Sequence, residues 1–336
     1  MPVAAAALVA GAALELVGIP ANATSFTVNC ATDNLQTTLS SAPSGSTVNV
    51  SGVCVGNFTV STNLTIAGPA TLDGGGNGVA LTIGPSAVTS LGSLTIRNGS
   101  ATNGAGIDNF GTTTVTGSSV SSNTAASFGG GVYNEPGASL TVTASNFSGD
   151  AAVDGGGITN GSGGTLTVRS SNFFSNSARY GAGIENDGGT VTVANSSFSH
   201  NQAYEAGGVF NFGSLTVASS NLSSNYATFG GAIFNYSPTS TVTIATSNLL
   251  FNQATNNGGA IWNKGTVNAT LTKLANNFAA SDGGAVFNEV GSTLVLNRAT
   301  VTNNVANTDG GGVYDSVSTV TNVNSTVTGN TPDDVS

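Results

Sequence analysis

The sequence predicts an all-β fold, a single right-handed parallel β-helix of about 12 coils with a short N-terminal capping helix. Three observations predict it. A block of small residues, an apolar residue and Asn or Asp recurs every 24–28 residues from residue 104 onward. Short apolar-Thr-apolar runs lie between the blocks, and glycine fills 47 of the 336 positions. Such a unit cannot bury its apolar face alone, so we expect successive units to stack as coils.

The composition excludes several classes of protein. With 6 Lys or Arg and 16 Asp or Glu, the chain has a net charge of −10 and lacks the charged faces of a helical protein. Intrinsic disorder is excluded because 39% of the residues are apolar. The negative charge and the lack of a basic run argue against nucleic acid and acidic membranes as partners. No apolar run reaches about 18 residues, so no transmembrane segment is expected.

Residues 1–23 are predicted to be a signal peptide. They form an Ala-rich apolar stretch that ends in Ala21-Asn22-Ala23, which fits the small-x-small rule of a cleavage site. The alternative is an N-terminal helix that covers one end of the fold, because no Lys or Arg precedes the apolar run and Glu15 interrupts it. A signal peptide predicts an extracellular or cell-surface location.

Residues 24–103 are predicted to form an N-terminal cap and three less regular coils. Residues 33–39 read as a short helix with Asp33 as N-cap and with Leu35 and Leu39 on one face. A helix lying over the first coil would shield an open sheet edge.

The two cysteines, Cys30 and Cys54, would pair in an exported protein and close a loop that stabilises the cap. The alternative is a pair of buried free thiols. Two cysteines and the single, distant His200 cannot complete a tetrahedral zinc site, so we expect no metal and no cofactor.

Residues 104–336 are predicted to form nine repeats of about 26 residues in strict vertical register. Equivalent residues then lie above one another, and the Asn that ends each block forms a ladder of side-chain amides. The ladder residues are Asn109, Asn134, Asn160, Asn186, Asn211, Asn235, Asn263 and Asn288. A second Asn or Asp in each unit, from Asn123 to Asn330, predicts a second ladder. The Gly pair before each inner Val or Ile supplies the backbone angles of a tight corner.

Two motifs of the repeat, GGA followed by Ile, Leu or Val, and FxxN, resemble the repeat of the chlamydial-type polymorphic outer-membrane proteins. Strict GGA matches begin at Gly230, Gly258 and Gly283, and strict FxxN matches begin at Phe173 and Phe198. The resemblance implies a pectin-lyase-like β-helix that is secreted or displayed at the cell surface, where outer-membrane association is possible, and that acts as an adhesin.

The enzymes that share this fold raise the question of catalysis. Asn307-Thr308-Asp309-Gly310 is similar to one polygalacturonase motif, but that family's other catalytic motifs are missing. Stacking could bring Asp282 and Asp309 within about 5 Å, the separation found in retaining glycosidases. However, their position before the Gly pair also holds Asp154, Glu205, Phe128 and Tyr180, which indicates a solvated corner. We therefore expect no catalysis, and Asp282 and Asp309 are the only weak candidates.

A column of aromatic residues is the predicted binding surface. The residue between the inner apolar position and the ladder Asn should point outward, and Asp108 and Glu185 in that slot indicate exposure. In the last five coils the slot holds Phe210, Phe234, Trp262, Phe287 and Tyr314. Exposed, they would form an apolar stripe for sugar rings or a protein. The alternative is a self-stacked or covered column that stabilises the coils.

The combined prediction is a secreted or surface-displayed, monomeric and non-catalytic scaffold that binds a cell-surface glycan or protein along its side. The alternative is a polysaccharide lyase or glycoside hydrolase of the pectin-lyase-like superfamily.

Overall fold

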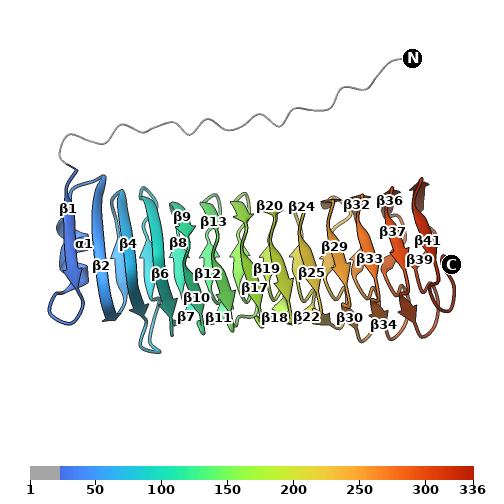
Figure 1. The fold of residues 1–336 in the computed structure, drawn as a ribbon, viewed down its shortest axis with the longest axis horizontal. Coiled ribbons are helices and arrows are strands. Elements are labelled where there is room, and N and C mark those ends of the chain that lie inside the picture. The colour runs from blue at the N-terminus through green and yellow to red at the C-terminus, as the bar shows by residue number, and fades with distance from the viewer. Residues whose placement is uncertain (1–22) are drawn as a thin grey trace, which may run out of the picture.

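The computed structural model describes residues 23–336, which form a straight rod of stacked coils (Figure 1). The named strands of neighbouring coils all pair in parallel, and the rod has about 12 turns. The predicted all-β parallel β-helix is confirmed. The predicted signal peptide lies outside the described residues except for Ala23.

The largest sheet has 22 strands and contributes two columns to the rod. In the first coils, β2 (Ser46–Val55), β4 (Leu64–Asp73) and β6 (Val88–Arg97) have ten residues each and span both columns. The columns separate after β6, which pairs with both β9 (Thr112–Thr116) and β10 (Ser119–Ser121). The first column is β1 (Ser25–Asn29), β2 (Ser46–Val55), β4 (Leu64–Asp73), β6 (Val88–Arg97), β9 (Thr112–Thr116), β13 (Ser139–Thr143), β16 (Thr165–Arg169), β20 (Thr190–Ala194), β24 (Ser214–Ala218), β28 (Thr241–Ala245), β32 (Thr266–Thr270), β36 (Thr293–Asn297) and β40 (Thr319–Val323). The second column is β10 (Ser119–Ser121), β14 (Asn146–Ser148), β17 (Asn172–Phe174), β21 (Ser197–Ser199), β25 (Asn221–Ser223), β29 (Asn248–Leu250), β33 (Lys273–Ala275), β37 (Thr300–Thr302) and β41 (Thr326–Thr328).

Three further sheets form the other two sides of the rod. The second sheet is β3 (Phe58–Val60), β5 (Leu81–Ile83), β8 (Ile107–Asn109), β12 (Val132–Asn134), β15 (Ile158–Asn160), β19 (Ile184–Asn186), β23 (Val209–Asn211), β27 (Ile233–Asn235), β31 (Ile261–Asn263), β35 (Val286–Asn288) and β39 (Val313–Asp315). The third side holds the pair β7 (Ser100–Asn103) and β11 (Thr124–Phe128), and then β18 (Ser177–Tyr180), β22 (Gln202–Glu205), β26 (Tyr226–Ala227), β30 (Gln253–Ala254), β34 (Phe278–Ala279) and β38 (Val305–Ala306).

One hydrophobic core runs the length of the rod. The alternating Val, Leu and Ile of each strand point into it, as period-two patterning predicts. Phe147, Phe173 and Phe198 stack inside successive coils, with ring centroids 4.9 and 4.5 Å apart. All three side chains are completely buried, so they anchor the middle of the rod.

Both predicted ladders are confirmed. In the first, each Asn donates from Nδ2 to Oδ1 of the next Asn at 2.7–2.9 Å, from Asn109 to Asn288, and these side chains are fully buried. The second ladder runs from Asn123 to Asn330 and ends where Asn330 donates to Asp334 at 2.9 Å. Its one step without a bond between side chains is from Asp150 to Asn176, where the Asp150 backbone N–H donates to Asn176 Oδ1 at 3.0 Å. The first ends in the same way, on the carboxylate of Asp315 at 3.3 Å. Each rung satisfies buried groups that would otherwise lose their hydrogen bonds.

A third ladder was not predicted. As far as the coil of Ser247, a buried Ser accepts from the backbone N–H of its counterpart in the preceding coil. For example, Ser145 accepts from Ser118 at 3.2 Å, and Ser171 accepts from Ser145 at 3.1 Å. The column continues through Ser196, Ser220 and Ser247. It satisfies donors at the corner between the two columns of the large sheet.

The chain makes most corners with left-handed backbone angles. The first Gly of the predicted pair has this geometry, for example φ 61° at Gly129 and φ 70° at Gly258. The other two corners of a coil use the same angles with ordinary side chains, such as His200, Leu271 and Arg298 at φ 50–56°. Stacking therefore holds these residues in a backbone region that only glycine enters readily.

Gly258→Ala is expected to destabilise the rod by at least about 3 kcal/mol. A Cβ at this position would lie 2.5 Å from the Ile261 carbonyl oxygen, and φ is +70°. Gly163→Ala is the matched control, because φ is +68° but no atom lies within 4 Å of its Cβ. The free energy of unfolding of the control should fall by only about 1–2 kcal/mol, the cost of placing Ala at this backbone angle. Equal urea midpoints for the two variants would show that the corner is not tightly packed.

The single helix of the described chain, α1 (Leu35–Ser41), lies at the N-terminal end of the rod. Leu35 and Leu39 are buried in the core, as predicted. The predicted N-cap was wrong by one residue, because Asn34 accepts from the Thr37 N–H at 3.1 Å. Asp33 instead accepts from the Asn29 N–H at 2.8 Å and so closes the preceding turn. With seven residues, α1 is too short to span a membrane, and the described chain has no other helix.

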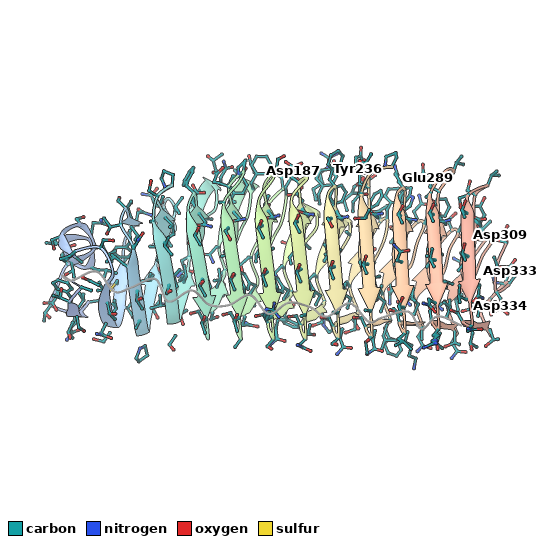
Figure 2. All side chains as sticks on the ribbon, turned by 90° about the horizontal axis from the view of Figure 1, so that it is seen from above. Asp187, Tyr236, Glu289, Asp309, Asp333 and Asp334 are labelled. Atoms are coloured by element: carbon teal, nitrogen blue, oxygen red, sulfur yellow. A yellow bond between two sulfur atoms is a disulfide. The ribbon has the colours of Figure 1, made fainter. Side chains whose placement is uncertain are left out.

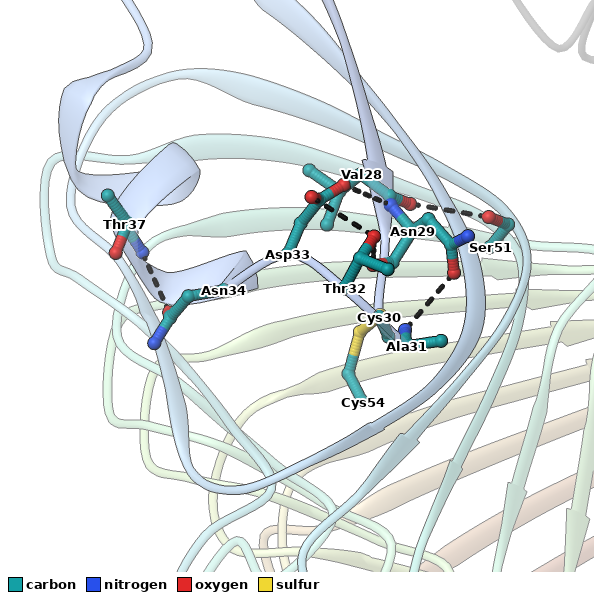
Figure 3. Close-up of a disulfide and its surroundings, with 10 residues drawn as sticks. All are labelled: Val28, Asn29, Cys30, Ala31, Thr32, Asp33, Asn34, Thr37, Ser51 and Cys54. Carbon is teal, nitrogen blue, oxygen red and sulfur yellow. Dashed lines mark hydrogen bonds between the residues drawn. A yellow bond between two sulfur atoms is a disulfide. The ribbon is translucent and has the colours of Figure 1, made fainter.

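The predicted disulfide between Cys30 and Cys54 is present (Figure 3). It links the turn after β1 to the end of β2, with the two Cα atoms 5.0 Å apart. The Cys54 side chain is buried against the core. The bond therefore ties the residues that lead into α1 to the first full coil.

Candidate functional site

The outer face of the second sheet carries one continuous column of side chains. The middle residue of each strand contributes to it, and the strands pair in register, so Glu185 lies between Thr159 and Phe210. From the N-terminal end the column is Thr59, Thr82, Asp108, Tyr133, Thr159, Glu185, Phe210, Phe234, Trp262, Phe287 and Tyr314. It is polar and acidic in the first half and aromatic in the second.

The aromatic half stacks as a column but is not the exposed stripe that the sequence predicts. The rings of Phe234 and Trp262 are parallel, 4.6 Å apart, and those of Phe287 and Tyr314 are 5.0 Å apart. Phe234 is 1% exposed, and Phe210 and Phe287 are 8–9% exposed. The alternative given above, a covered column, describes these three rings, whereas Trp262 and Tyr314 are half-buried. Ligand binding by these five residues stays a prediction.

Side chains from the turn after each strand cover the rings. The Lys264 ammonium lies 5.1 to 5.4 Å from the ring centroids of Phe234, Tyr236 and Trp262. Glu289 accepts from the Trp262 indole N–H at 2.9 Å and lies 3.7 Å from the Lys264 ammonium. These residues directly follow ladder Asn residues, whose fixed positions hold them over the column.

A cleft of about 340 Å³ opens at the junction between the acidic and aromatic halves. Ligand sites commonly span about 300–1,000 Å³. Its lining residues are Phe128, Asp154, Tyr180, Glu185, Asp187, Glu205, Phe210 and Tyr236. Figure 2 shows Asp187 and Tyr236 along one long edge of the rod, with Glu289 farther along the same edge. The opposite wall stacks Phe128, Asp154, Tyr180 and Glu205 in successive coils.

Glu185 forms the floor of the cleft and is the least expected of its residues. The sequence indicated an exposed side chain, but only 7% of Glu185 is exposed, because both walls rise beside it. Its Oε2 atom finds no hydrogen-bond partner within residues 23–336. Burial, and then the charges of Asp187 and Asp154, hold the pKa of Glu185 well above its usual range.

Asp154 and Glu205, on the wall of the cleft, share with Glu185 an unpartnered carboxylate oxygen and a raised pKa. Each is half-buried, not a solvated corner, and each has one carboxylate oxygen that no group in the described chain contacts by a hydrogen bond. Burial raises the pKa of Asp154, helped by Asp187 and opposed by Arg179. Burial also raises the pKa of Glu205, and the charges of Lys264 and Arg179 oppose it.

A second acidic pair, Asp108 and Glu135, lies nearer the N-terminal end of the column, and neither residue lines the cleft. Burial, and then the neighbouring Glu135 carboxylate, raise the pKa of Asp108 to about 7. Burial also raises the pKa of Glu135. The cleft and this pair together hold six acidic residues, and four of the six keep an unpartnered buried oxygen. Shifts of this kind concentrate at functional sites.

The two catalytic candidates from the sequence lie elsewhere. Asp282 and Asp309 occupy neighbouring coils, as expected, since the Gly283 N–H donates to the Asp309 carbonyl oxygen at 3.1 Å. Their carboxylates are engaged locally, Asp309 with the Gly310 N–H and Asp282 with the Ser281 hydroxyl. Neither residue lines the cleft. A catalytic role for them stays untested.

The carboxylates of the cleft are not arranged as a metal centre. Across residues 23–336, no group of three or more His, Cys, Asp or Glu side chains is placed to hold a metal ion. Carboxylates between aromatic walls are instead suited to hydrogen-bonding a polar ligand whose faces are apolar, as sugars are. The chain matches no protein-family model and no curated protein sequence. The cleft's own chemistry therefore carries the functional argument.

Proposed function

We propose that this protein is a secreted or surface-displayed scaffold that binds a glycan in the cleft around Glu185. The observation that carries the proposal is a buried carboxylate with an unpartnered oxygen on the floor of an aromatic-walled cleft. Sugar hydroxyls would donate to the carboxylates, and the C–H faces of the ring would pack on Tyr180, Phe210 and Tyr236. The proposed binding site therefore lies where the aromatic column meets its acidic half, and not over all five rings.

The wider assignment rests on features of the whole chain. The GGA and FxxN motifs support membership of the polymorphic outer-membrane repeat family and an adhesin-like role. The disulfide supports export, because such bonds persist in oxidising compartments. Crossover sterics support right-handed coiling. We further propose that α1 caps the rod, because its buried Leu35 and Leu39 lie at the N-terminal end of the core.

Binding is tested on an array of neutral, cationic and anionic glycans. We expect the wild-type protein to bind at least one class, and Tyr236→Ala to weaken that binding about tenfold by removing one wall. Phe251→Ala is the control, because Phe251 is 52% exposed and lies outside the cleft. If no glycan is bound, or if the two variants bind alike, the cleft is not a glycan site.

Glycoside hydrolysis is the second candidate function. Buried Glu185, whose raised pKa favours the protonated acid, lies near exposed Asp187, and glycosidases pair a proton-donating carboxyl with an ionised one. Release of reducing ends by the wild-type protein, lost in Glu185→Gln, would make this the function. Binding without release of reducing ends or unsaturated uronates would leave the non-catalytic scaffold.

A further inference from the structure

None of the carboxylates that line the acidic cleft forms an ion pair with a Lys or Arg of residues 23–336. Within the described chain, ion pairs join Arg97 to Asp73 and Lys264 to Glu289, and neither pair includes a cleft carboxylate. Arg179 is exposed, with its guanidinium 5.1 Å from the Tyr180 ring centroid. Buried carboxylates without a partner destabilise a protein unless a ligand supplies donors.

We propose that the cleft selects sugars that carry a free, protonated amino group. This inference rests on the proposed glycan-binding function and names the class of ligand. A neutral sugar supplies hydroxyl donors, but an ammonium supplies up to three donors and a positive charge at one atom. Glu185 on the floor and Asp154 on the wall each offer an unpartnered oxygen.

The aromatic walls favour the same ligand. Tyr180 and Phe210 lie 5.4 Å apart by ring centroid, and Phe210 and Tyr236 are also 5.4 Å apart. Aromatic faces attract cations as well as sugar C–H groups. The protein already uses this interaction farther along the column, where Lys264 lies over three rings. Polyuronides are disfavoured, because their carboxylates would enter a site that is already negative.

Binding of an ammonium should be linked to proton release. The charged groups that face Glu185 are Asp154 and Asp187, with Glu205 and Arg179 on the adjoining wall. Burial and like charges favour the protonated form of Glu185, so an ammonium that pairs with the Glu185 carboxylate must displace its proton. Affinity is therefore expected to rise with pH until the ligand's own amine loses its charge.

The test compares two ligands that differ at one group. Titration calorimetry is run with a β-1,4-linked glucosamine hexamer and with the fully N-acetylated hexamer, which has the same backbone but no charge. We expect the free amine form to bind about tenfold tighter or more, with release of protons detected in buffers of different ionisation enthalpy. The double variant D154N/E185Q should lower this preference below about threefold.

A charge-matched variant distinguishes recognition in the cleft from attraction by the overall negative charge of the protein. D33N/D333N also removes two carboxylates, but at sites that do not line the cleft, and it should keep the full preference. An equal loss in both double variants would overturn the inference by showing nonspecific attraction of a polycation. Equal or tighter binding of the N-acetylated hexamer would also overturn it while leaving glycan binding intact. If neither hexamer binds and the array shows no other glycan ligand, both proposals fail. Circular dichroism of each variant verifies that it is folded.

Discussion

Replacing Asp150 by asparagine is expected to stabilise the protein by about 3–5 kcal/mol at pH 8 and by little at pH 4. Asp150 is the only acid inside the second ladder and is fully buried. Its Oδ1 accepts from the N–H and the side-chain amide of Asn123. Its Oδ2 has no partner in residues 23–336, whereas an amide there would donate as every other rung does.

The pH dependence follows from the direction of the shift. Burial raises the pKa of Asp150 from 3.8 to about 8, despite the hydrogen bonds from Asn123 that lower it. The folded protein therefore keeps a proton that the unfolded chain releases above about pH 4. The contribution of Asp150 to stability is fully present below pH 4 and is lost as the pH rises toward 8. Asparagine does not titrate, so the variant should lose this dependence.

Urea unfolding at pH 4, 6 and 8 measures the effect. Asp33→Asn is the control, because Asp33 is exposed and accepts from a backbone N–H in a turn, which an amide oxygen can also do. Its stability should stay within about 0.5 kcal/mol at each pH. An Asp150→Asn protein that is less stable than wild type at pH 8 would show that the ladder requires the charge.

Phe173→Ala is expected to destabilise the protein by about 3–5 kcal/mol. The Phe173 ring is fully buried and lies between the parallel rings of Phe147 and Phe198. Removing it leaves a cavity that the flanking rings cannot fill, because each is held by the backbone register of its own coil.

The neighbouring residue provides the control. Phe174 follows on the same strand but points outward and is 46% exposed, with a single ring contact to His200 at 5.4 Å. Phe174→Ala should change the free energy of unfolding by less than about 1 kcal/mol. Comparable losses in the two variants would contradict the alternation of inward and outward side chains.

The fold could be predicted because each feature recurs at a fixed period. A repeated Asn is visible in a single sequence, and parallel stacking turns that repetition into the ladder from Asn109 to Asn288. The serine ladder was missed because Ser is common throughout the chain and its counterparts include Thr272 and Ala299. The left-handed corners were found only where glycine marks them, since Leu271 and Arg298 carry no local signal for such angles.

The candidate site was harder to predict because burial depends on flanking residues. Alternation along a strand correctly places Glu185 and Phe234 on the outer face, but it does not show that Tyr236 and Lys264 cover that face. Acids at one slot were interpreted as exposed because isolated carboxylates usually are. The sequence does contain one signal for the site. Acids at three different positions of the repeat, Asp154, Glu185 and Asp187, fall in neighbouring coils and so lie close together.

Each Asn rung of the two ladders donates toward the C-terminal end, and the Asn rungs inside the series also accept from the preceding coil. Apart from the coil that holds Asp150, each coil thus presents the same donors and acceptors as its neighbours, and such a coil could be duplicated or deleted between two others without stranding an amide. Asp315 and Asp334 accept the last donors and close the series there. Recombination between copies of the repeat could therefore lengthen or shorten the rod in steps of one coil, while a coil inserted in the reverse direction would break both series.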